Sequence, residues 1–503
     1  MKRVISLIAL ILLLSFISNI FISCKSSTSG NNDKTTTGQN ASVNTSTTTA
    51  ADDRDEKYIS NLPAADFGGK ELKLLINVYG GTAGTDNDIC VEESSADIIK
   101  DAVYKRNTNM QVKYNFKITP IYREYTDTLG QLITRDVSAG LRSYDAAFLT
   151  MNQTSTIVSS NVLMDLNKVP NINLDKYYWD QSVRKQLSFG DKLFYDVSDI
   201  SVSSMDQTYL LLYNKKLIEE YNVEPLYPLV FSGKWTLDKF NSIIKDKSHN
   251  LTGGDKLGTK DFWGFSADDE MYYALFCGSG ERLTVKDANN MPVLVTPTER
   301  MSKAIEIIGE IMKQNNSTYN ANLFYKDEPD WETNWPSIPV FREDRALFFG
   351  NYISTMSGFR NMQSDFGVLP VPKLDENQEN YNTYAYQLGV VASIPNNLSD
   401  EDLSFVGFTL EALSEESRKL LVPAYYDTTL KVKYSRDDES SQILDMVFQN
   451  RTFDPMYLYD FGGFMTAFRS LLRDGKSNVT SLFEKNGPKA ESAIQKLVDA
   501  LNK

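Results

Sequence analysis

The segment LKLLINV, from Leu72 to Val78, opens the part of the chain that is rich enough in apolar residues to fold, and it decides the fold class. The segment is almost continuously apolar and is followed by Gly80-Gly81, so it predicts a buried β-strand that ends in a loop. A helical apolar stripe follows over residues 98–103, and over 112–118 apolar residues alternate with polar ones as in a strand. Strand alternating with helix predicts an α/β fold on a mostly parallel sheet.

The alternation continues to the C-terminus. A helix is expected over residues 129–137, and Thr296-Pro297-Thr298-Glu299 predicts a capping box, with proline in the first turn, before another helix. Further strands are expected at 144–149, 208–213, 366–372 and 388–394, and further helices after Thr236 and Ser399 and at 490–501. A chain of 503 residues is longer than one hydrophobic core usually supports, so at least two domains are expected.

The N-terminus resembles a lipoprotein signal. Lys2 and Arg3 precede an apolar run over 4–22, and Phe21-Ile22-Ser23-Cys24 ends it with a small residue and a cysteine. Residues 1–23 are therefore predicted to be a signal peptide, and Cys24 the lipid-carrying first residue of the mature chain. The alternative is an ordinary transmembrane anchor, because the run is long enough to cross a bilayer. Residues 24–57 are rich in Ser, Thr and Asn and predict a disordered tether.

The net charge of −14 disfavours several partners and kinds of chemistry. An acidic surface does not favour nucleic acid or an anionic bilayer. Apart from Cys24, only Cys90 and Cys277 remain, and they are either paired or two free thiols. The one histidine, His249, lies in a polar stretch that predicts a surface loop, which disfavours histidine-dependent catalysis.

The motifs that would indicate an enzyme are incomplete. The glycine-rich stretch Gly80 to Gly84 lacks the spacing and the lysine of a phosphate-binding loop, and Asp86 and Asp88 would repel phosphate. Asp268-Asp269-Glu270 has no calcium-loop register and predicts a polar loop or the wall of a cleft. Aromatic residues make up 12% of the chain, and many stand beside Gly, Asn or Asp, as in sites that stack on sugar rings.

Several motifs in order give the chain a resemblance to a known family. After the lipoprotein signal come YDAAFL (144–149), LLYNKKLIEEYNVEP (211–225) before Trp235-Thr236, FREDRALFFGN (341–351) and DFGVLPVPK (365–373). Together they resemble the family 1 extracellular solute-binding proteins, which are the receptors of ABC importers. The resemblance implies a two-lobed α/β fold of the type II periplasmic-binding-protein class, with a hinge and a ligand cleft between the lobes.

The resemblance also implies domain boundaries. The crossings between lobes fall at Tyr213-Asn214-Lys215 and at about residues 383–389. The N-terminal lobe then contains residues 58–212 and 384–435, and the C-terminal lobe contains residues 213–383 and 436–503. The chain departs from smaller members in a longer second lobe and in an acidic loop over 374–382.

Ligand-binding residues are implied only by position in the resemblance. They are Tyr79 beside the glycine-rich turn, Met151, Asn152 and Gln153 after the YDAAFL strand, Trp263, Asp269 and Tyr272 in the second-lobe wall, Asn351 and Tyr352 after the RALFFGN strand, Tyr384 and Tyr386 at the second crossing, and Phe461 and Phe464 near the C-terminus.

The function expected on this basis is the capture of a small solute and its delivery to an ABC permease. The solute expected is a sugar or an oligosaccharide. The protein would work without a cofactor or metal, as a monomer anchored through Cys24 on the outer face of the cytoplasmic membrane. The alternatives are a membrane-tethered glycan-active enzyme, which would turn its substrate over, and an adhesion or structural lipoprotein, which would bind no small ligand.

Overall fold

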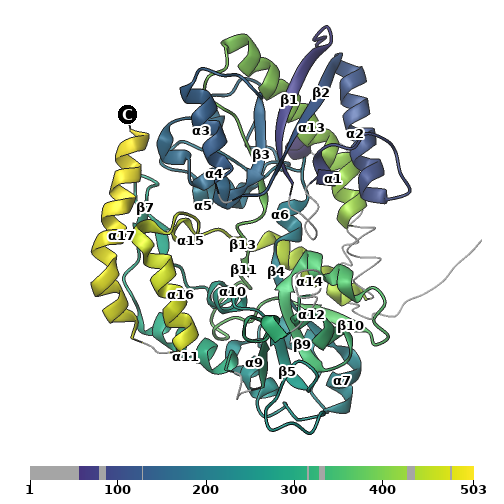
Figure 1. Ribbon diagram of the computed structural model, residues 1–503, viewed down its shortest axis with the longest axis vertical. Coiled ribbons are helices and arrows are strands. Elements are labelled where there is room, and N and C mark those ends of the chain that lie inside the picture. The colour runs from purple at the N-terminus through teal and green to yellow at the C-terminus, as the bar shows by residue number, and fades with distance from the viewer. Residues whose placement is uncertain are drawn as a thin grey trace, which may run out of the picture. The chain divides into compact units, whose positions relative to one another are not determined.

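The computed structural model describes residues 56–78, 86–126, 128–313, 317–327, 335–426, 437–475 and 478–502 (Figure 1). Residues 1–55, including Cys24 and most of the predicted tether, and Tyr79 lie outside the described residues, so what the sequence predicts for them stays a prediction. The last two residues of the predicted tether, 56 and 57, belong to a 3-10 helix over Glu56–Tyr58. Among the described helices, none has both the length and the apolar character needed to cross a membrane.

The first predicted strand is the centre of a four-stranded sheet in the order β12-β3-β1-β2. Its strands are β1 (Lys70–Val78), β2 (Phe116–Glu124), β3 (Ala146–Thr150) and β12 (Val390–Ser393). β1 pairs in parallel with β2 and β3, whereas β12 runs antiparallel to β3. The mostly parallel sheet predicted from the alternation of strand and helix is confirmed.

A second sheet has five strands in the order β10-β4-β9-β5-β8. They are β4 (Tyr209–Asn214), β5 (Trp263–Ala267), β8 (Thr318–Asn320), β9 (Ala346–Tyr352) and β10 (Phe366–Leu369). β5 pairs in parallel with β8 and β9, and β4 runs antiparallel between β9 and β10. Two short two-stranded pairs complete the strands: β6 (Thr284–Lys286) with β7 (Pro292–Leu294), and β11 (Thr383–Tyr384) with β13 (Arg451–Thr452).

Helices connect and cover these strands. They are α1 (Asp86–Ile89), α2 (Ile98–Tyr114), α3 (Gly130–Ser138), α4 (Met151–Ser155), α5 (Gln181–Leu187), α6 (Ser203–Asp206), α7 (Lys215–Glu220), α8 (Leu226–Phe231), α9 (Leu237–Ile244), α10 (Glu270–Gly278), α11 (Glu299–Ile311), α12 (Ser337–Arg342), α13 (Asp400–Pro423), α14 (Asp438–Gln449), α15 (Pro455–Tyr459), α16 (Phe464–Asp474) and α17 (Val479–Leu501). α13 packs on α2 beside the first sheet, and α16 contacts α10, α11 and α17 (Figure 1).

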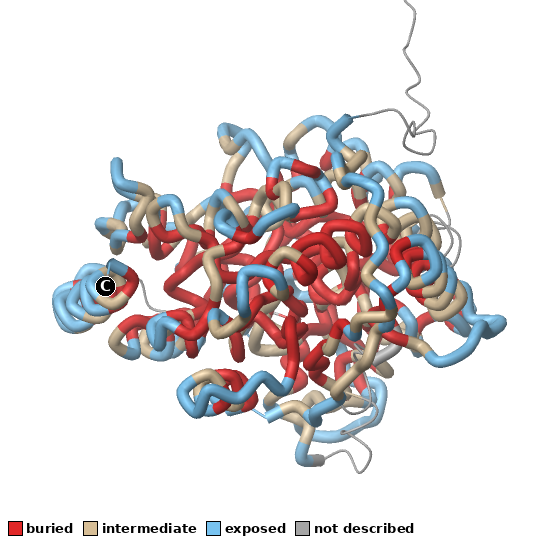
Figure 2. Tube along the Cα trace, turned by 90° about the horizontal axis from the view of Figure 1, so that it is seen from above, coloured by how far each residue is buried: buried red, intermediate tan, exposed pale blue. Residues whose placement is uncertain are grey.

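The apolar faces of these elements meet in two clusters of buried residues. One includes Leu72, Leu74 and Ile76 of β1 with the apolar face of α13, and the other includes the inner residues of β4, β5 and β9. Figure 2 shows the buried segments gathered in the interior with exposed segments around them. Cys90 and Cys277 are both buried and free, so the two-thiol alternative holds.

Three sequence predictions need correction. The helix α2 continues to Tyr114 and ends at Asn115 in the left-handed conformation, so residues 112–114 are helical and the strand begins only at Phe116. Thr298, and not Thr296, is the N-cap of α11, because its side chain accepts a hydrogen bond from Met301 N, and Pro297 therefore precedes the helix. The first crossing between the lobes was predicted at Tyr213. All of β4, including residues 209–212, pairs within the second sheet, so the chain enters that sheet before Tyr209.

Candidate functional site

The carboxyl edge of the first sheet is built by the turn from β3 into α4. Thr150 caps α4, and the side chain of Gln153 reaches back to accept from Thr150 N at 3.1 Å while it donates to Thr126 O at 2.8 Å. Asn152 donates to the Tyr125 hydroxyl at 3.1 Å. Of the three residues predicted here, Met151 and Gln153 are buried, and Asn152 keeps part of its surface exposed.

The carboxyl edge of the second sheet lies where β5 and β9 end side by side. Asn351 donates from Nδ2 to Asp268 Oδ2 at 3.0 Å, and its own Oδ1 accepts from Tyr352 N at 2.8 Å. Asp269 accepts from Asn320 Nδ2 at 2.7 Å. Strand ends of this kind are where α/β folds bind ligands, because loops and side chains there leave the sheet while the scaffold stays rigid.

Four tyrosines gather beside this second edge. The ring of Tyr209, fully buried at the start of β4, lies 5.8 Å from Tyr352, 5.3 Å from Tyr384 and 6.0 Å from Tyr386. The rings of Tyr352 and Tyr386 are stacked, with 6.1 Å between centroids and 8° between planes. Tyr352 and Tyr386 are half-buried whereas Tyr384 is buried, so two of the three predicted tyrosines present a surface to the exterior.

The segment from Tyr386 to Gly389 touches both edges. At the first edge, Met151 N donates to Gly389 O at 2.9 Å and Asn152 N donates to Gln387 O at 3.1 Å. At the second edge, Tyr386 N donates to Gln207 O at 2.8 Å, and its ring stacks on Tyr352. The short segment 386–389 therefore bonds Asn152 through its backbone and contacts Tyr352 through the ring of Tyr386.

The acids that follow β5 differ in their environments. Burial, and then the charge of Glu270, raises the pKa of Asp268 from the ordinary 3.8 to about 7. Glu270 forms a bidentate pair with Arg469 and accepts from the Tyr457 hydroxyl at 2.8 Å. Asp269 pairs with Arg473 at 2.9 Å.

The remaining predicted residues lie elsewhere. Trp263 has no exposed surface, and its indole N–H donates to Gly258 O at 3.0 Å. Phe461 stacks on Tyr459 and Phe464 packs edge-on against Phe483, both buried among the C-terminal helices. Tyr272 lies beside a small pocket that it shares with Asp269, Arg469 and Arg473. Sequence position alone does not reveal this burial, because an aromatic side chain serves a core and a sugar site equally well.

Two residues of the second edge were missed by sequence position. Tyr209 stands in an apolar run that indicates only a core strand, and Asp268 was interpreted as part of a polar loop or cleft wall without being singled out as a ligand-binding residue. The register that sets Tyr209 opposite Tyr352 is the feature that brings Tyr209 to the site. Asp268 directly follows the strand β5, which the sequence analysis did not predict.

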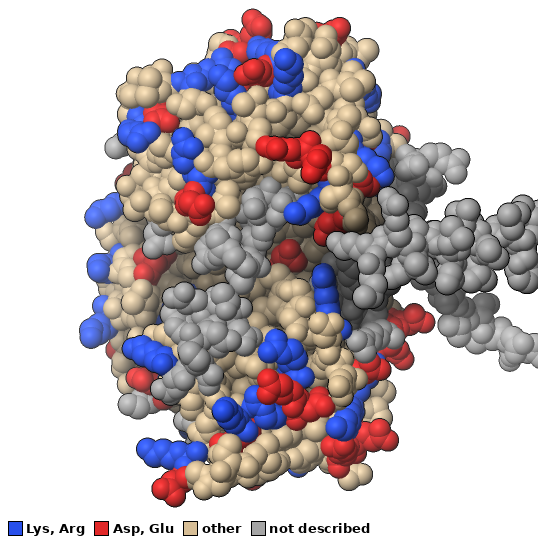
Figure 3. Space-filling view, turned by 45° about the vertical axis from the view of Figure 1, so that its right-hand side comes forward, with Lys and Arg blue, Asp and Glu red and all other residues tan. Residues whose placement is uncertain are grey.

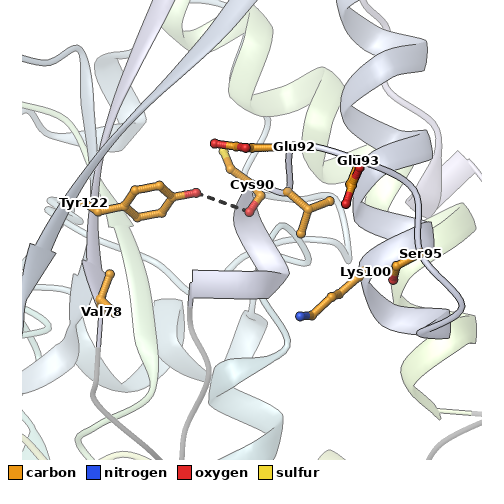
Figure 4. Close-up of a pocket in the computed structure, with 8 residues that line it drawn as sticks. Val78, Cys90, Glu92, Glu93, Ser95, Lys100 and Tyr122 are labelled. Carbon is orange, nitrogen blue, oxygen red and sulfur yellow. Dashed lines mark hydrogen bonds between the residues drawn. The ribbon is translucent and has the colours of Figure 1, made fainter.

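A separate pocket of about 500 Å³ opens beside β1 and β2 (Figure 4). The Tyr122 hydroxyl donates to Cys90 O at 3.4 Å across it, and Glu92, Glu93 and Lys100 line its other side. Within the described ranges, no group of three or more His, Cys, Asp and Glu side chains is placed to hold a metal ion. On the face drawn in Figure 3, acidic and basic side chains are interspersed and form no broad patch of one sign.

Comparisons with known proteins relate the chain by fold. No family model matches the sequence, and no curated protein is detectably similar to it in sequence. Two solved structures from Listeria monocytogenes share the architecture: the ABC substrate-binding protein Lmo0181 in complex with cycloalternan, at 12% identity, and the maltose-binding periplasmic protein MalE in complex with maltose, at 16% identity. Each superposes with a TM-score of 0.50 over 86% of this chain and 98% of the other. This chain therefore has the two-sheet α/β fold of the type II periplasmic binding proteins.

Proposed function

We propose that this chain is the solute-binding component of an ABC importer and that it captures a sugar or oligosaccharide between the carboxyl edges of its two sheets. The observation that carries the proposal is the segment 386–389, whose backbone bonds α4 at the first edge and whose Tyr386 ring stacks on Tyr352 at the second. Side chains able to bind a sugar therefore lie on both sides of the segment 386–389, where the chain passes from one sheet to the other.

The chemistry of these side chains suits a polyhydroxylated ring. Aromatic faces such as those of Tyr352 and Tyr386 pack against the apolar C–H face of a pyranose. Asn152 supplies a partly exposed amide and Asp268 a carboxyl group that can exchange hydrogen bonds with hydroxyls, whereas Asn351 is buried and positions Asp268. Capture of this kind needs no bond to be made or broken, only closure of the two halves around the ligand.

The solved structures support the same class of ligand. The Listeria proteins are described in complex with cycloalternan and with maltose, which are both sugars. Because they share only the fold with this chain, they favour a sugar and do not specify which one.

The partners follow from the predicted anchor. Cys24 would carry lipid and hold the chain, through residues 24–57, at the outer face of the cytoplasmic membrane. A tether raises the effective concentration of the receptor at its permease without any attraction by charge, which suits an acidic body. We propose the two lobes with the bounds implied by the resemblance, except that the chain first crosses between them ahead of Tyr209. We also propose that the protein acts as a monomer without a cofactor.

The direct test is thermal unfolding of the full chain against a panel of mono- and oligosaccharides, peptides and polyamines. A ligand at 100 times its Kd stabilises a receptor by about 2.7 kcal/mol, which displaces the melting temperature measurably. We expect at least one carbohydrate to do so, with 1:1 stoichiometry and no product. A panel without any stabilising sugar would contradict the proposal, and released product would indicate the glycan-active enzyme instead.

A further inference from the structure

Residues 451–459, which comprise β13 and the short helix α15, bond to elements of both sheets, and we call them the bridging segment (Figure 1). At its start, Gln186 Nε2 donates to Arg451 O at 3.1 Å, and Phe453 N donates to Gln186 Oε1 at 3.0 Å. Arg451 also forms an ion pair with Asp180, the N-cap of α5. Because α5 precedes the crossing of the chain into the second sheet, these contacts fix the start of the bridging segment to the first sheet's side.

The middle of the bridging segment bonds to elements of the second sheet's side. The side chain of Asp454 accepts from Leu283 N at 2.8 Å, just before β6. The Tyr457 hydroxyl donates to Glu270 Oε2 at 2.8 Å, and the Tyr457 ring lies 5.0 Å from that of Tyr384. Tyr384 is one of the four tyrosines beside the second edge, so Tyr457 contacts this group directly.

Tyr459, two residues further along, bonds to the first sheet's side again. Its hydroxyl lies 3.2 Å from that of Tyr195, which is in turn 3.0 Å from the Ser155 hydroxyl. Its ring packs edge-on against Phe189, with 5.5 Å between centroids. Ser155 belongs to α4, the helix that carries Asn152 at the first edge. A chain of two hydroxyl contacts therefore joins Tyr459 to the helix of the first edge.

The opposite directions of Tyr457 and Tyr459 follow from helical geometry. Residues two positions apart in an α-helix point about 200° apart, so these two side chains leave opposite faces of α15. Asp454 caps the helix by accepting from Met456 N at 2.9 Å, with Pro455 in the first turn. A capped helix with one ring fixed on each face is suited to hold two neighbouring elements at a set separation.

This separation bears on binding because the proposed ligand contacts both edges. A site whose two sides are already held in place loses less conformational freedom on binding than one whose sides move independently. A spacer can therefore strengthen binding without any contact to the sugar. Removing such a spacer weakens ligand binding by more than an equal loss of packing elsewhere in the molecule does.

Resting on the proposed function, we propose that α15 sets the spacing of the two carboxyl edges, and that Tyr457 and Tyr459 are positioning residues for sugar binding. Tyr459 positions α4, and with it Asn152. Tyr457 positions the tyrosines of the second edge through Tyr384. Both act through these neighbours and not by contact with the sugar.

Tyr459→Phe is the decisive variant, because it keeps the ring against Phe189 and removes only the hydroxyl group that contacts Tyr195. Tyr381→Phe is the matched control, since it removes another tyrosine hydroxyl, which donates to Val230 O of α8 at 3.0 Å. Calorimetry with the full chain uses maltose, cellobiose, lactose and every further sugar that stabilises the chain in the thermal panel. We expect Tyr459→Phe to weaken binding about 3- to 10-fold and the control to stay within about twofold, with similar melting temperatures.

A second readout separates positioning from packing. If Tyr459 holds Asn152 in place, the roughly fivefold loss caused by Asn152→Ala should shrink to less than about twofold in a Tyr459→Phe background, and it should persist in a Tyr381→Phe background. Tyr195→Phe removes the other hydroxyl of the same contact and should weaken binding by the same factor as Tyr459→Phe. A folding defect in one of these two variants then leaves the other to decide.

Three outcomes overturn the inference: native affinity in Tyr459→Phe and Tyr195→Phe, a loss of the same size in Tyr381→Phe, or full additivity with Asn152→Ala. Each of them leaves the proposed function standing, because each requires a sugar that binds the native chain. If no carbohydrate binds the native chain, the proposed function fails, and the inference fails with it.

Discussion

The two carboxyl edges of the molecule differ in how their polar groups are satisfied. At the first edge, Thr150 and Gln153 cap one another and Asn152 bonds Tyr125, so the edge is neutral and its hydrogen bonds are mostly internal. At the second edge, three consecutive acids stand near a cluster of tyrosine rings, two of the acids are paired with arginines of α16, and burial raises the pKa of the third, Asp268.

This difference assigns separate roles to the two edges. The polar groups of the first edge are largely occupied by one another, whereas the second edge presents the partly exposed aromatic residues Tyr352 and Tyr386, whose burial by a ligand is favourable. We therefore expect the second edge to supply most of the affinity. The first edge should contribute less.

The largest expected effect concerns the charge that compensates the second edge. Arg469→Ala removes two hydrogen bonds to Glu270 and one to the Tyr457 hydroxyl and leaves a partly buried carboxylate without its cation, so it should lower the free energy of unfolding by about 3 kcal/mol. Chemical denaturation measures the change. Arg473→Ala is the control, because that side chain is nearly half exposed and its pair with Asp269 should contribute less than about 1 kcal/mol. Equal losses in the two variants would remove the distinction between buried and exposed pairing at this edge.

The next effect concerns the tyrosine rings. Tyr352→Ala removes a half-exposed ring from the stack with Tyr386 and should weaken sugar binding by about 2 kcal/mol, or roughly 30-fold, with the melting temperature almost unchanged. Calorimetry gives the affinity and thermal unfolding gives the stability. Tyr177→Ala replaces an exposed aromatic residue outside the candidate site and should leave binding as it is. Strong destabilisation by Tyr352→Ala would show instead that this ring belongs to the core.

A smaller effect should depend on pH. The folded chain holds the pKa of Asp268 at about 7 against an ordinary 3.8, so the native state binds more protons than the unfolded state between these values, and stability falls as pH rises from about 4 to 7. Asp268→Asn should remove this fall and stabilise the chain at pH 8, where the native carboxylate is charged, with almost no effect near pH 4.

Burial raises the pKa of Tyr209 and Tyr386 well above the ordinary value of 10, so both tyrosines stay neutral over this pH range. Melting temperatures of both proteins across the pH range measure the difference. A gain that is the same at pH 4 and pH 8 would mean that Asp268 does not titrate as described.

The smallest effect belongs to the first edge. Asn152→Ala removes one partly exposed amide and should weaken sugar binding by about 1 kcal/mol, or roughly fivefold. A loss as large as that of Tyr352→Ala would reverse the assignment of affinity to the second edge.

The fold was predictable because its signals are local. The apolar run of β1, the stripe of α11 and the caps at Thr236 and Ser399 each lie within one element, and the structure has all of them. The end of α2 was missed because alternation over 112–118 resembles a strand, whereas the helix ends only at Asn115 in its left-handed conformation. A pattern of period two cannot exclude the last turn of a helix.

The site was less predictable because it depends on contacts that are remote in sequence. The pairing of Asp269 and Glu270 is decided by α16, and the role of Tyr209 by the register of β4 on β9. Trp263 and Tyr386 are both aromatic residues beside polar ones, yet one is in the core and the other is half-exposed. Composition does not separate these cases, because burial is a property of the assembled sheets.

A ligand site between the two edges is tested most directly by calorimetric titration with the sugar that gives the largest thermal stabilisation. The titration is made with the native chain, with Asn152→Ala and with Tyr352→Ala. If the ligand is held between the two edges, both variants bind more weakly than the native chain, Tyr352→Ala by the larger factor, and both keep the native melting temperature. Native affinity in both variants would contradict a site between the edges of the two sheets.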